Sequence, residues 1–252
     1  MLEGYAPGYA RDAISMMAGR SAPDRAEFVL PLLTTDSRVL DVGCGPGSIT
    51  VGLRPAAWVL GVDTEPGQIA LARAAAQHLS TVDFLAASVY HLPLPDSSVD
   101  VAFSHALFEH LARPADALAE LRRVVRPGGS IALSTSDWSR AKLRPRTGNV
   151  EAALRGHFLL RKRSGGDPFA GRRLAENVEQ AGFQVARMRT RHRPDMTYRQ
   201  LAEYVEVRLI AALQEPGADR EQLASAARSA WAWARGRDGD FAQHWTEILA
   251  TR

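Results

Sequence analysis

The stretch Val39-Leu40-Asp41-Val42-Gly43-Cys44-Gly45-Pro46-Gly47-Ser48-Ile49-Thr50 decides the fold of this 252-residue chain. It contains an apolar strand, a turn with three glycines and the start of a helix. Glycine has no Cβ, so the turn can adopt positive φ angles and can touch a ligand through its backbone. In an open α/β sheet such a turn follows the first strand, at the edge where ligands bind. The stretch therefore predicts a ligand-binding turn.

Asp63 closes the next apolar run, Trp58-Val59-Leu60-Gly61-Val62, and stands twenty positions after Gly43. A carboxylate at this place accepts hydrogen bonds from both ribose hydroxyls of a nucleoside. An aspartate between a strand and a helix also serves as a helix N-cap, here ahead of Glu65-Pro66. Together with the glycines, the position of Asp63 favours ribose binding.

The glycine spacing separates two classes of nucleoside-binding protein. Nicotinamide oxidoreductases use G-x-G-x-x-G, in which the last glycine brings a helix close and the helix N-terminus holds a pyrophosphate. Here the order is G-x-G-x-G, with Ser48 and Ile49 after the last glycine. The sequence therefore predicts a nucleoside site without a pyrophosphate seat, which argues against a nicotinamide oxidoreductase.

Strand-length apolar runs alternate with helical patterns through the first half of the chain. The expected strands are 38–42, 58–62, 82–86, 99–104 and 130–134, and the expected helices between them are 48–53, 66–79 and 114–125. Nearly continuous apolar strands that alternate with helices are typical of a parallel sheet covered on both faces. We expect an α/β fold with a Rossmann-like, doubly wound and mostly parallel sheet.

Further segments flank this alternation. The expected elements are helices at 11–19 and 22–33, a Gly/Arg/Pro-rich stretch at 139–171, a helix at 172–181, a strand at 183–189, two helices within 197–235 and a last strand at 241–249. The two late helices are divided at Glu215-Pro216-Gly217. We interpret them as an insertion, which either covers a substrate pocket or only packs Trp231 and Trp233 into a core.

The composition is that of an ordinary globular protein, with 46% hydrophobic and 23% charged residues. No apolar run approaches the length that spans a bilayer, and residues 1–20 lack a basic region followed by an apolar stretch. We therefore expect a cytoplasmic protein without a membrane partner. Cys44 is the single cysteine, so an intramolecular disulfide is excluded and a zinc site is not expected.

Charge is distributed unevenly along the chain. Residues 1–139 hold 10 Lys+Arg and 15 Asp+Glu, whereas residues 140–252 hold 21 and 13. Much of the excess lies in 140–163, where Glu151 is the single acidic residue. One interpretation is a surface for nucleic acid or an acidic substrate. We favour the other, a solvated face, because base-stacking aromatic residues are nearly absent there, Phe158 excepted.

Taken together, these features resemble the class I S-adenosylmethionine-dependent methyltransferases over about residues 1–190. The matching pieces are Asp41, Gly43, Gly45 and Gly47, the ribose-binding Asp63, Leu92-Pro93-Leu94-Pro95-Asp96, Val99-Asp100, and Arg123 through Pro127-Gly128-Gly129. Within the class, the chain looks like the small-molecule enzymes of ubiquinone and natural-product biosynthesis. The resemblance implies S-adenosyl-L-methionine as cofactor, a seven-stranded sheet, no metal, and methyl transfer to an O-, N- or C-nucleophile of a small molecule.

The resemblance also implies a domain organisation. We expect one methyltransferase domain over 1–252, with N-terminal lid helices at 1–34, a cofactor-binding core at 35–190, a helical cap at 191–240 and the last strand at 241–252. The sequence carries no motif that specifies the acceptor or the oligomeric state.

The resemblance carries over a set of cofactor-binding positions. They are Tyr9, Asp41, Gly43, Gly45, Gly47, Asp63, Thr64, Ser88, Val89, Ser104 and His110. The family often has an acidic residue for the adenine amino group where this chain has Ser88, although a hydroxyl or the backbone there can still bond the ring. Tyr9 belongs to a lid-like segment, in which an aromatic ring either faces the sulfonium or only packs the first helix. His110 stands where many members carry histidine, which favours a structural or cofactor-side role.

Methyl transfer is a direct displacement, so the protein mainly aligns the reactants and excludes water. Cys44 is therefore not expected to act as a nucleophile. An oxygen nucleophile gains from a general base, and His105, just after the fourth strand, is the first candidate by the carboxyl-end rule. Resemblance to some sugar O-methyltransferases adds Asp137, which stands where they have an acid, and Glu109, which replaces a histidine of theirs. Glu109 is either a base that burial makes more basic or a solvated helix residue.

Three classes of function stay open, and the first is favoured. They are a small-molecule methyltransferase, a nucleic-acid methyltransferase or binder that uses 140–163, and a methyltransferase-fold protein without activity. Binding of S-adenosylhomocysteine separates the third class from the others, and salt-sensitive binding to RNA or DNA identifies the second.

Overall fold

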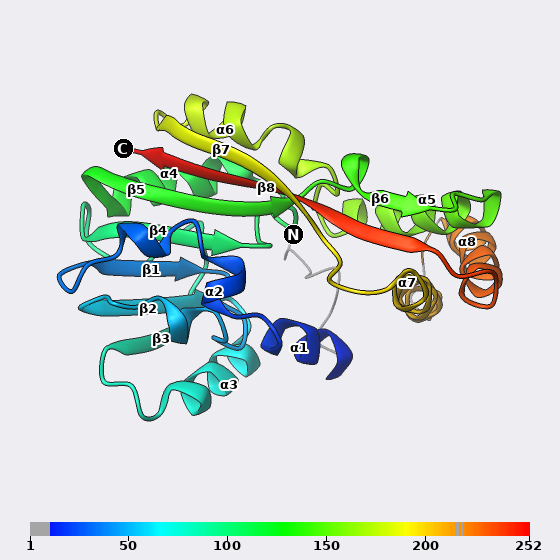
Figure 1. Cartoon of the computed structure of the whole chain (residues 1–252), viewed down its shortest axis with the longest axis horizontal. Coiled ribbons are helices and arrows are strands. Elements are labelled where there is room, and N and C mark those ends of the chain that lie inside the picture. The colour runs from blue at the N-terminus through cyan, green and yellow to red at the C-terminus, as the bar shows by residue number, and fades with distance from the viewer. Residues whose placement is uncertain (1–10, 215–216, 218) are drawn as a thin grey trace.

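The computed structural model describes residues 11–214, 217 and 219–252, which form one sheet of eight strands with helices around it (Figure 1). The strand order is β3-β2-β1-β4-β5-β8-β6, with β7 also paired to β8. The strands are β1 Arg38–Val42, β2 Trp58–Asp63, β3 Val82–Ala86, β4 Val99–His105, β5 Val125–Ser136, β6 Lys142–Arg144, β7 Gln184–Arg193 and β8 Asp240–Thr251. The first five strands are parallel, and β8 runs antiparallel to its three neighbours. The expected Rossmann-like, mostly parallel α/β sheet is confirmed.

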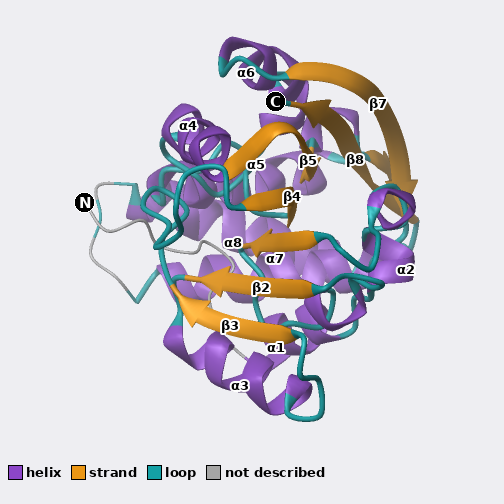
Figure 2. Ribbon diagram, turned by 90° about the vertical axis from the view of Figure 1, so that its left-hand side faces the viewer, coloured by secondary structure: helices purple, strands orange, loops and turns teal. Residues whose placement is uncertain are grey.

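Helices cover both faces of the sheet (Figure 2). They are α1 Arg11–Ala18, α2 Ala22–Arg25, α3 Pro66–Ala76, α4 Pro114–Val124, α5 Gly148–Arg163, α6 Leu174–Gln180, α7 Tyr198–Ala212 and α8 Arg220–Ala234. Short 3-10 turns occupy Leu30–Leu32, Thr50–Gly52, Trp138–Arg140 and Ala170–Arg172. Residues of α4 and α6 belong to the core cluster on one face, and residues of α2 and α3 belong to the cluster on the other.

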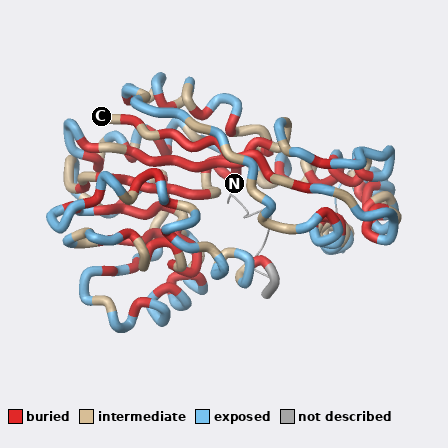
Figure 3. The backbone as a smooth tube through the Cα atoms, viewed as in Figure 1, coloured by how far each residue is buried: buried red, intermediate tan, exposed pale blue. Residues whose placement is uncertain are grey.

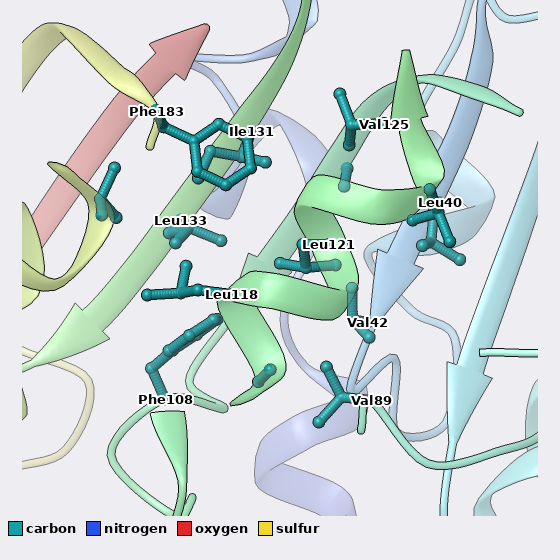
Figure 4. Packing of buried hydrophobic residues seen from close by; sticks show 14 of the residues in the cluster. Leu40, Val42, Val89, Phe108, Leu118, Leu121, Val125, Ile131, Leu133 and Phe183 are labelled. Atoms are coloured by element: carbon teal, nitrogen blue, oxygen red, sulfur yellow. The ribbon is translucent and has the colours of Figure 1, made fainter. Parts of the chain in front are cut away.

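The two faces follow from the side-chain alternation along β1. Leu40 and Val42 belong to the same cluster as Leu118 and Leu121 of α4, which are fully buried (Figure 4). Val39, the residue just before Leu40, belongs to the opposite cluster. Successive side chains of a strand point to opposite faces, so a strand covered on both sides must be apolar nearly throughout. Burial of each such leucine or valine stabilises the fold by about 1.5–3 kcal/mol.

A helical cap, made of α5, α7 and α8, lies at the end of the molecule toward which the parallel strands point (Figure 1). The cap has a buried core of its own, visible as the red segments of these helices in Figure 3. A Cβ on Gly156 of α5 would lie 2.4 Å from the Cβ of Ala226 in α8, so the glycine permits close helix packing. Leu143 of β6 pairs with Phe241 of β8, and both side chains are buried in the cap. The long strand β8 thus joins the cap to the sheet.

Apart from shifted element ends, the main differences between the observed and the expected elements are three. Residues 148–163 form α5 of the cap, although the expected organisation put them in the core at 35–190. The short strand β6 adds an eighth strand to the seven expected. The helices expected at 22–33 and 48–53 are reduced to α2 and 3-10 turns, where Pro31 and Gly52 disfavour regular helix. Among the described residues, none of the helices has the length and apolarity needed to cross a membrane.

Candidate active site

A first cavity, of about 850 Å³ counted with its mouth, opens at the carboxyl ends of β1, β2 and β4. Its lining residues are Met17, Arg20, Val42, Gly43, Gly45, Val62, Asp63, Thr64, Gln68, Ala87, Ser88, Val89, Tyr90, His105, Ala106, Leu107, His110 and Leu111. The cavity lies where the glycine turn predicts a ligand, because parallel strands expose their loops at this edge of the sheet.

The three glycines of the turn have positive φ angles, and they serve two purposes. A Cβ on Gly47 (φ +76°) would lie 2.7 Å from Cζ of Phe84, so this glycine is required by packing beneath the turn. A Cβ on Gly45 (φ +53°) would lie 3.5 Å from Sδ of Met17, and Gly45 lines the first cavity together with Gly43. Gly47 does not belong to the lining. Two of the three glycines therefore face the ligand space.

The carboxylate of Asp63 is held in the first cavity by two backbone amides. Oδ2 accepts from the amide of Gly45 at 2.9 Å, and Oδ1 accepts from the amide of Glu65 at 3.0 Å. Burial raises the pKa of Asp63 above its usual range, and the amide donors oppose that rise. A carboxylate has roughly four acceptor positions, so about two remain for hydroxyl donors of a ligand. Asp63 thus braces the turn and also retains the capacity to bind a ribose.

Gln68, in the first turn of α3, is a residue of the first cavity that the sequence analysis did not identify. Its side chain is 2% exposed, and Oε1 has no hydrogen-bond partner among the described residues. A buried amide oxygen without a donor is costly, so Gln68 becomes a candidate for a contact with a ligand of this cavity. The signal in the sequence was its place just after the β2 acid, on the helix that follows.

Asp41 and Ser104 support the turn from behind and line neither cavity. The hydroxyl of Thr50 donates to Oδ2 of Asp41 at 2.6 Å, and the hydroxyl of Ser104 donates to the carbonyl of Val42 at 2.9 Å. Burial, and to a smaller extent the charge of Asp63, raises the pKa of Asp41 to about 7, against the effect of the Thr50 hydrogen bond. The cofactor contacts expected at Asp41 and Ser104 are therefore internal hydrogen bonds.

Four other expected cofactor positions line the first cavity, namely Thr64, Ser88, Val89 and His110. The hydroxyl of Ser88 accepts from the amide of Tyr90 at 3.2 Å. Burial, and next the charge of Arg161, lowers the pKa of His110 well below its usual range, so the imidazole is neutral. Tyr9 lies outside the described residues.

A second cavity, of about 730 Å³ counted with its mouth, lies between the sheet edge and the cap. Its lining residues are Ala13, Met16, Met17, Arg20, Ala106, Glu109, His110, Ser136, Trp138, Arg161, Asp195, Met196, Leu201, Tyr204, Phe241, Gln243 and Trp245. Met17, Arg20, Ala106 and His110 line both cavities. The two cavities are therefore neighbours across a common boundary.

His105, at the end of β4, lines the first cavity, and its ring stacks on Trp245, which lines the second. The imidazole is buried, and neither ring nitrogen has a hydrogen-bond partner among the described residues. Burial, followed by the charges of Arg20, Arg25 and Arg193, lowers the pKa of His105 well below its usual range. A neutral imidazole with a free nitrogen lone pair can accept a proton.

Glu109 and Asp137 occupy different places relative to the cavities. Glu109 is buried, lines the second cavity and accepts a hydrogen bond from the hydroxyl of Thr135. Asp137 lines neither cavity. Its Oδ1 accepts from the amide of Ser139 at 2.9 Å, as an N-cap of the turn Trp138–Arg140. The structure thus places Glu109 in the wall of the second cavity, while Asp137 is engaged in capping.

The basic stretch at 140–163 is divided between surface and interior. Arg146 pairs with Glu151 at 3.3 Å on the surface, and Arg163 pairs with Asp219 at 2.8 Å. Arg161, by contrast, is buried and lines the second cavity.

Within the described part of the chain, no group of three or more His, Cys, Asp or Glu residues is arranged to hold a metal ion.

Comparison with known proteins agrees with this arrangement. Residues 40–133 match the methyltransferase domain family. The chain is 32% identical over 183 residues to an uncharacterised methyltransferase of Schizosaccharomyces pombe. The alignment covers 68% of this chain and 65% of that protein. It is 36% identical over 146 residues to trans-aconitate 2-methyltransferase of Methylobacterium nodulans. This alignment covers 57% of this chain and 50% of that enzyme. The chain therefore spans less than two thirds of the length of these relatives.

A solved structure shows the same fold over almost the whole chain. A putative methyltransferase from Bacillus halodurans superposes with a TM-score of 0.62 and 16% identity, covering 97% of this chain and 99% of that one. The sheet order, the glycine turn with Asp63 and the matched domain lead to one assignment. The chain belongs to the class I S-adenosylmethionine-dependent methyltransferases.

Proposed function

We propose that this chain transfers a methyl group from S-adenosyl-L-methionine, bound in the first cavity, to a small molecule bound in the second. The observation that carries the proposal is the common boundary of the cavities at Met17, Arg20, Ala106 and His110. Direct displacement needs a nucleophile aligned with the reacting carbon at contact distance, and neighbouring cavities provide that approach. The trans-aconitate relative, whose name states a small acceptor, supports the same substrate size.

The residues of the first cavity fit the cofactor. Asp63 keeps acceptor positions for ribose hydroxyls, Gly45 leaves its backbone open to the cavity, and Oε1 of Gln68 lacks a donor among the described residues. When bound, S-adenosyl-L-methionine supplies a methyl group on a positively charged sulfur, which makes a good leaving group. The chemistry therefore needs no covalent intermediate on the protein.

The remaining task of the chain is to hold the reactants and exclude water. The hydroxyl of Ser48 donates to the carbonyl of Met17 at 2.9 Å, which fastens α1 against the glycine turn. Met17 and Arg20 contribute to the walls of both cavities. Exclusion of water by the bound reactants would strengthen electrostatic contacts and favour displacement over hydrolysis.

A general base is part of the proposal for an oxygen acceptor. His105 is assigned this role, because its imidazole is neutral and its nitrogens have no partner among the described residues. Glu109 is the second candidate, since its carboxylate lines the second cavity. Asp137 is the third candidate, and it would have to move to take part, because it lines neither cavity.

The experiment is a transfer assay with trideuteromethyl-labelled S-adenosyl-L-methionine and a low-molecular-mass metabolite extract, read by mass spectrometry. We expect labelled small molecules and a matching amount of S-adenosylhomocysteine. Asp63→Ala should strongly reduce both at a limiting cofactor concentration, whereas substitution of Asp83, an exposed acid on β3, by alanine should not. Label that enters added RNA or DNA instead would support the nucleic-acid alternative, and absence of any labelled product would contradict the proposal.

A further inference from the structure

Arg161, in the last turn of α5, is an unusual buried cation in the wall of the second cavity. It is 8% exposed, and Nε and Nη1 have no hydrogen-bond partner among the described residues. Two residues later, Arg163 has an ordinary partner in Asp219 at 2.8 Å. The helix therefore holds one paired arginine on its outside and one without a described partner on its inside.

The groups that face Arg161 do not neutralise it. Burial lowers the pKa of His157 to about 3 and that of His110 well below its usual range, so both imidazoles are neutral. Burial raises the pKa of Tyr204, whose phenol therefore keeps its proton. None of these three side chains brings a negative charge to the guanidinium.

The acidic residues that line the second cavity have other partners. The carboxylate of Glu109 accepts a hydrogen bond from the hydroxyl of Thr135. Asp195 accepts from Nη2 of Arg25 at 2.6 Å and from the indole nitrogen of Trp245 at 3.2 Å. No ion pair of the described residues involves Arg161. A buried charge without a partner is strongly unfavourable, and native proteins keep such groups mainly at functional sites.

We propose that Arg161 binds a carboxylate of the methyl acceptor, which makes the acceptor an organic monocarboxylate with an apolar body. This proposal rests on the proposed function. One planar guanidinium matches one carboxylate in charge and in hydrogen-bond geometry. The apolar body contacts the rest of the wall, formed by Met16, Met196, Leu201, Trp138, Tyr204, Phe241 and Trp245.

Binding measurements test the substrate class directly. The protein is first saturated with S-adenosylhomocysteine. Calorimetry then measures the affinity for 3-phenylpropanoate and for octanoate, and compares each acid with its primary amide. Phenyl phosphate is measured as a further anion. We expect at least one acid to bind about tenfold or more tightly than its amide, because a hydrogen bond to a charged group is involved. Arg161→Met should remove that preference, whereas Arg155→Met, at an exposed position of the same helix, should keep it.

Several outcomes would overturn the inference. They are equal affinity for acid and amide, an unchanged preference in Arg161→Met, tighter binding of phenyl phosphate than of either acid, and no binding of any of these molecules while S-adenosylhomocysteine binds. Failure to bind S-adenosylhomocysteine itself would contradict the proposed function instead, so the two failures are distinguishable.

Thermal unfolding of the ligand-free protein gives an independent check that needs no substrate. If Arg161 is kept for a ligand, Arg161→Met removes an unpaired buried charge and should leave the melting temperature unchanged or raise it. A structural arginine would show the opposite, a clear fall in melting temperature. Such a fall, with Arg155→Met unchanged, would overturn the inference.

Discussion

The imidazole of His105 stacks on the indole of Trp245, with ring centroids 4.5 Å apart and planes inclined by 24°. His105 ends β4, and Trp245 lies in β8. Because β5 lies between these two strands in the sheet, the stacked pair reaches across β5. His105 lines the first cavity and Trp245 lines the second. The stacked pair therefore forms part of the division between the proposed cofactor and acceptor spaces, which is where a proton acceptor is useful.

Two substitutions at His105 separate a chemical role from a packing role. His105→Phe keeps an aromatic ring against Trp245 but loses the basic nitrogen, whereas His105→Ala loses both. If His105 is the base, both variants should lower turnover about 10²-fold or more while affinity for S-adenosylhomocysteine stays nearly constant. Rates come from the labelled-methyl assay with its identified acceptor. Retained turnover in His105→Phe would reduce His105 to a packing residue.

The pH dependence of the rate follows from the shift at His105. Burial, and then the nearby arginines Arg20, Arg25 and Arg193, lowers its pKa well below 6.5. A base acts in its neutral form, which persists down to the lowered pKa and is lost only below it. The rate should therefore stay level from neutral pH to pH 6.5, and its acid limb should lie lower. An acid limb centred above pH 6.5 would show that another group is the base.

Asp41 should make stability depend on pH in a defined direction. Its folded pKa of about 7 lies above the ordinary 3.8, so the folded state keeps a proton that the unfolded state loses. This contribution is fully present below pH 3.8 and is lost as pH rises through 7. Asp41→Asn removes the titration and can still accept from Thr50, so it should stabilise the fold by about 2–4 kcal/mol at pH 8.

Urea unfolding at pH 4 and pH 8 checks this prediction. The gain from Asp41→Asn should be much smaller at pH 4, where the wild-type side chain is already neutral. Asp36→Asn, at an exposed position before β1, serves as the control. A gain that does not grow between the two pH values would mean that burial leaves the titration of Asp41 little changed.

Alanine substitutions should distinguish the packing glycine from the ligand-facing one. Gly47→Ala combines positive φ with a Cβ 2.7 Å from Phe84, so it should lower the free energy of unfolding by about 2–4 kcal/mol. Gly45→Ala meets no atom closer than 3.5 Å and should cost only about 1–2 kcal/mol, mostly from φ. Its main effect should be weaker binding of S-adenosylhomocysteine. Urea unfolding and calorimetry measure the two effects, and equal destabilisation by both substitutions would contradict this division.

The sheet and the first cavity were largely predictable from sequence, because their signals are local. Apolar strands with a two-faced pattern, the glycine turn and the acid after β2 each depend on neighbouring residues. The turn glycines were predicted as one ligand-binding unit, yet Gly47 faces Phe84 of β3. That contact joins segments far apart in the sequence and leaves no local pattern.

The cap and the second cavity were less predictable for the same reason. The basic residues of 140–163 obscured the helical pattern of α5, whose Gly156 packs against α8 some seventy residues later. Arg161 looked like one of several surface cations, and only the tertiary packing shows that it is buried. Asp137 was a candidate base by resemblance, although Ser139 engages its carboxylate in a cap.

Calorimetry with S-adenosylhomocysteine tests the central claim most directly, namely that the first cavity holds the cofactor through Asp63. Wild-type protein should bind at one site, and Asp63→Ala should bind about 10²-fold more weakly, because it loses charge-assisted hydrogen bonds to two hydroxyls. Asp83→Ala should bind as wild type does. Failure of the wild type to bind, or equal affinity in Asp63→Ala with an unchanged circular dichroism spectrum, would contradict the account.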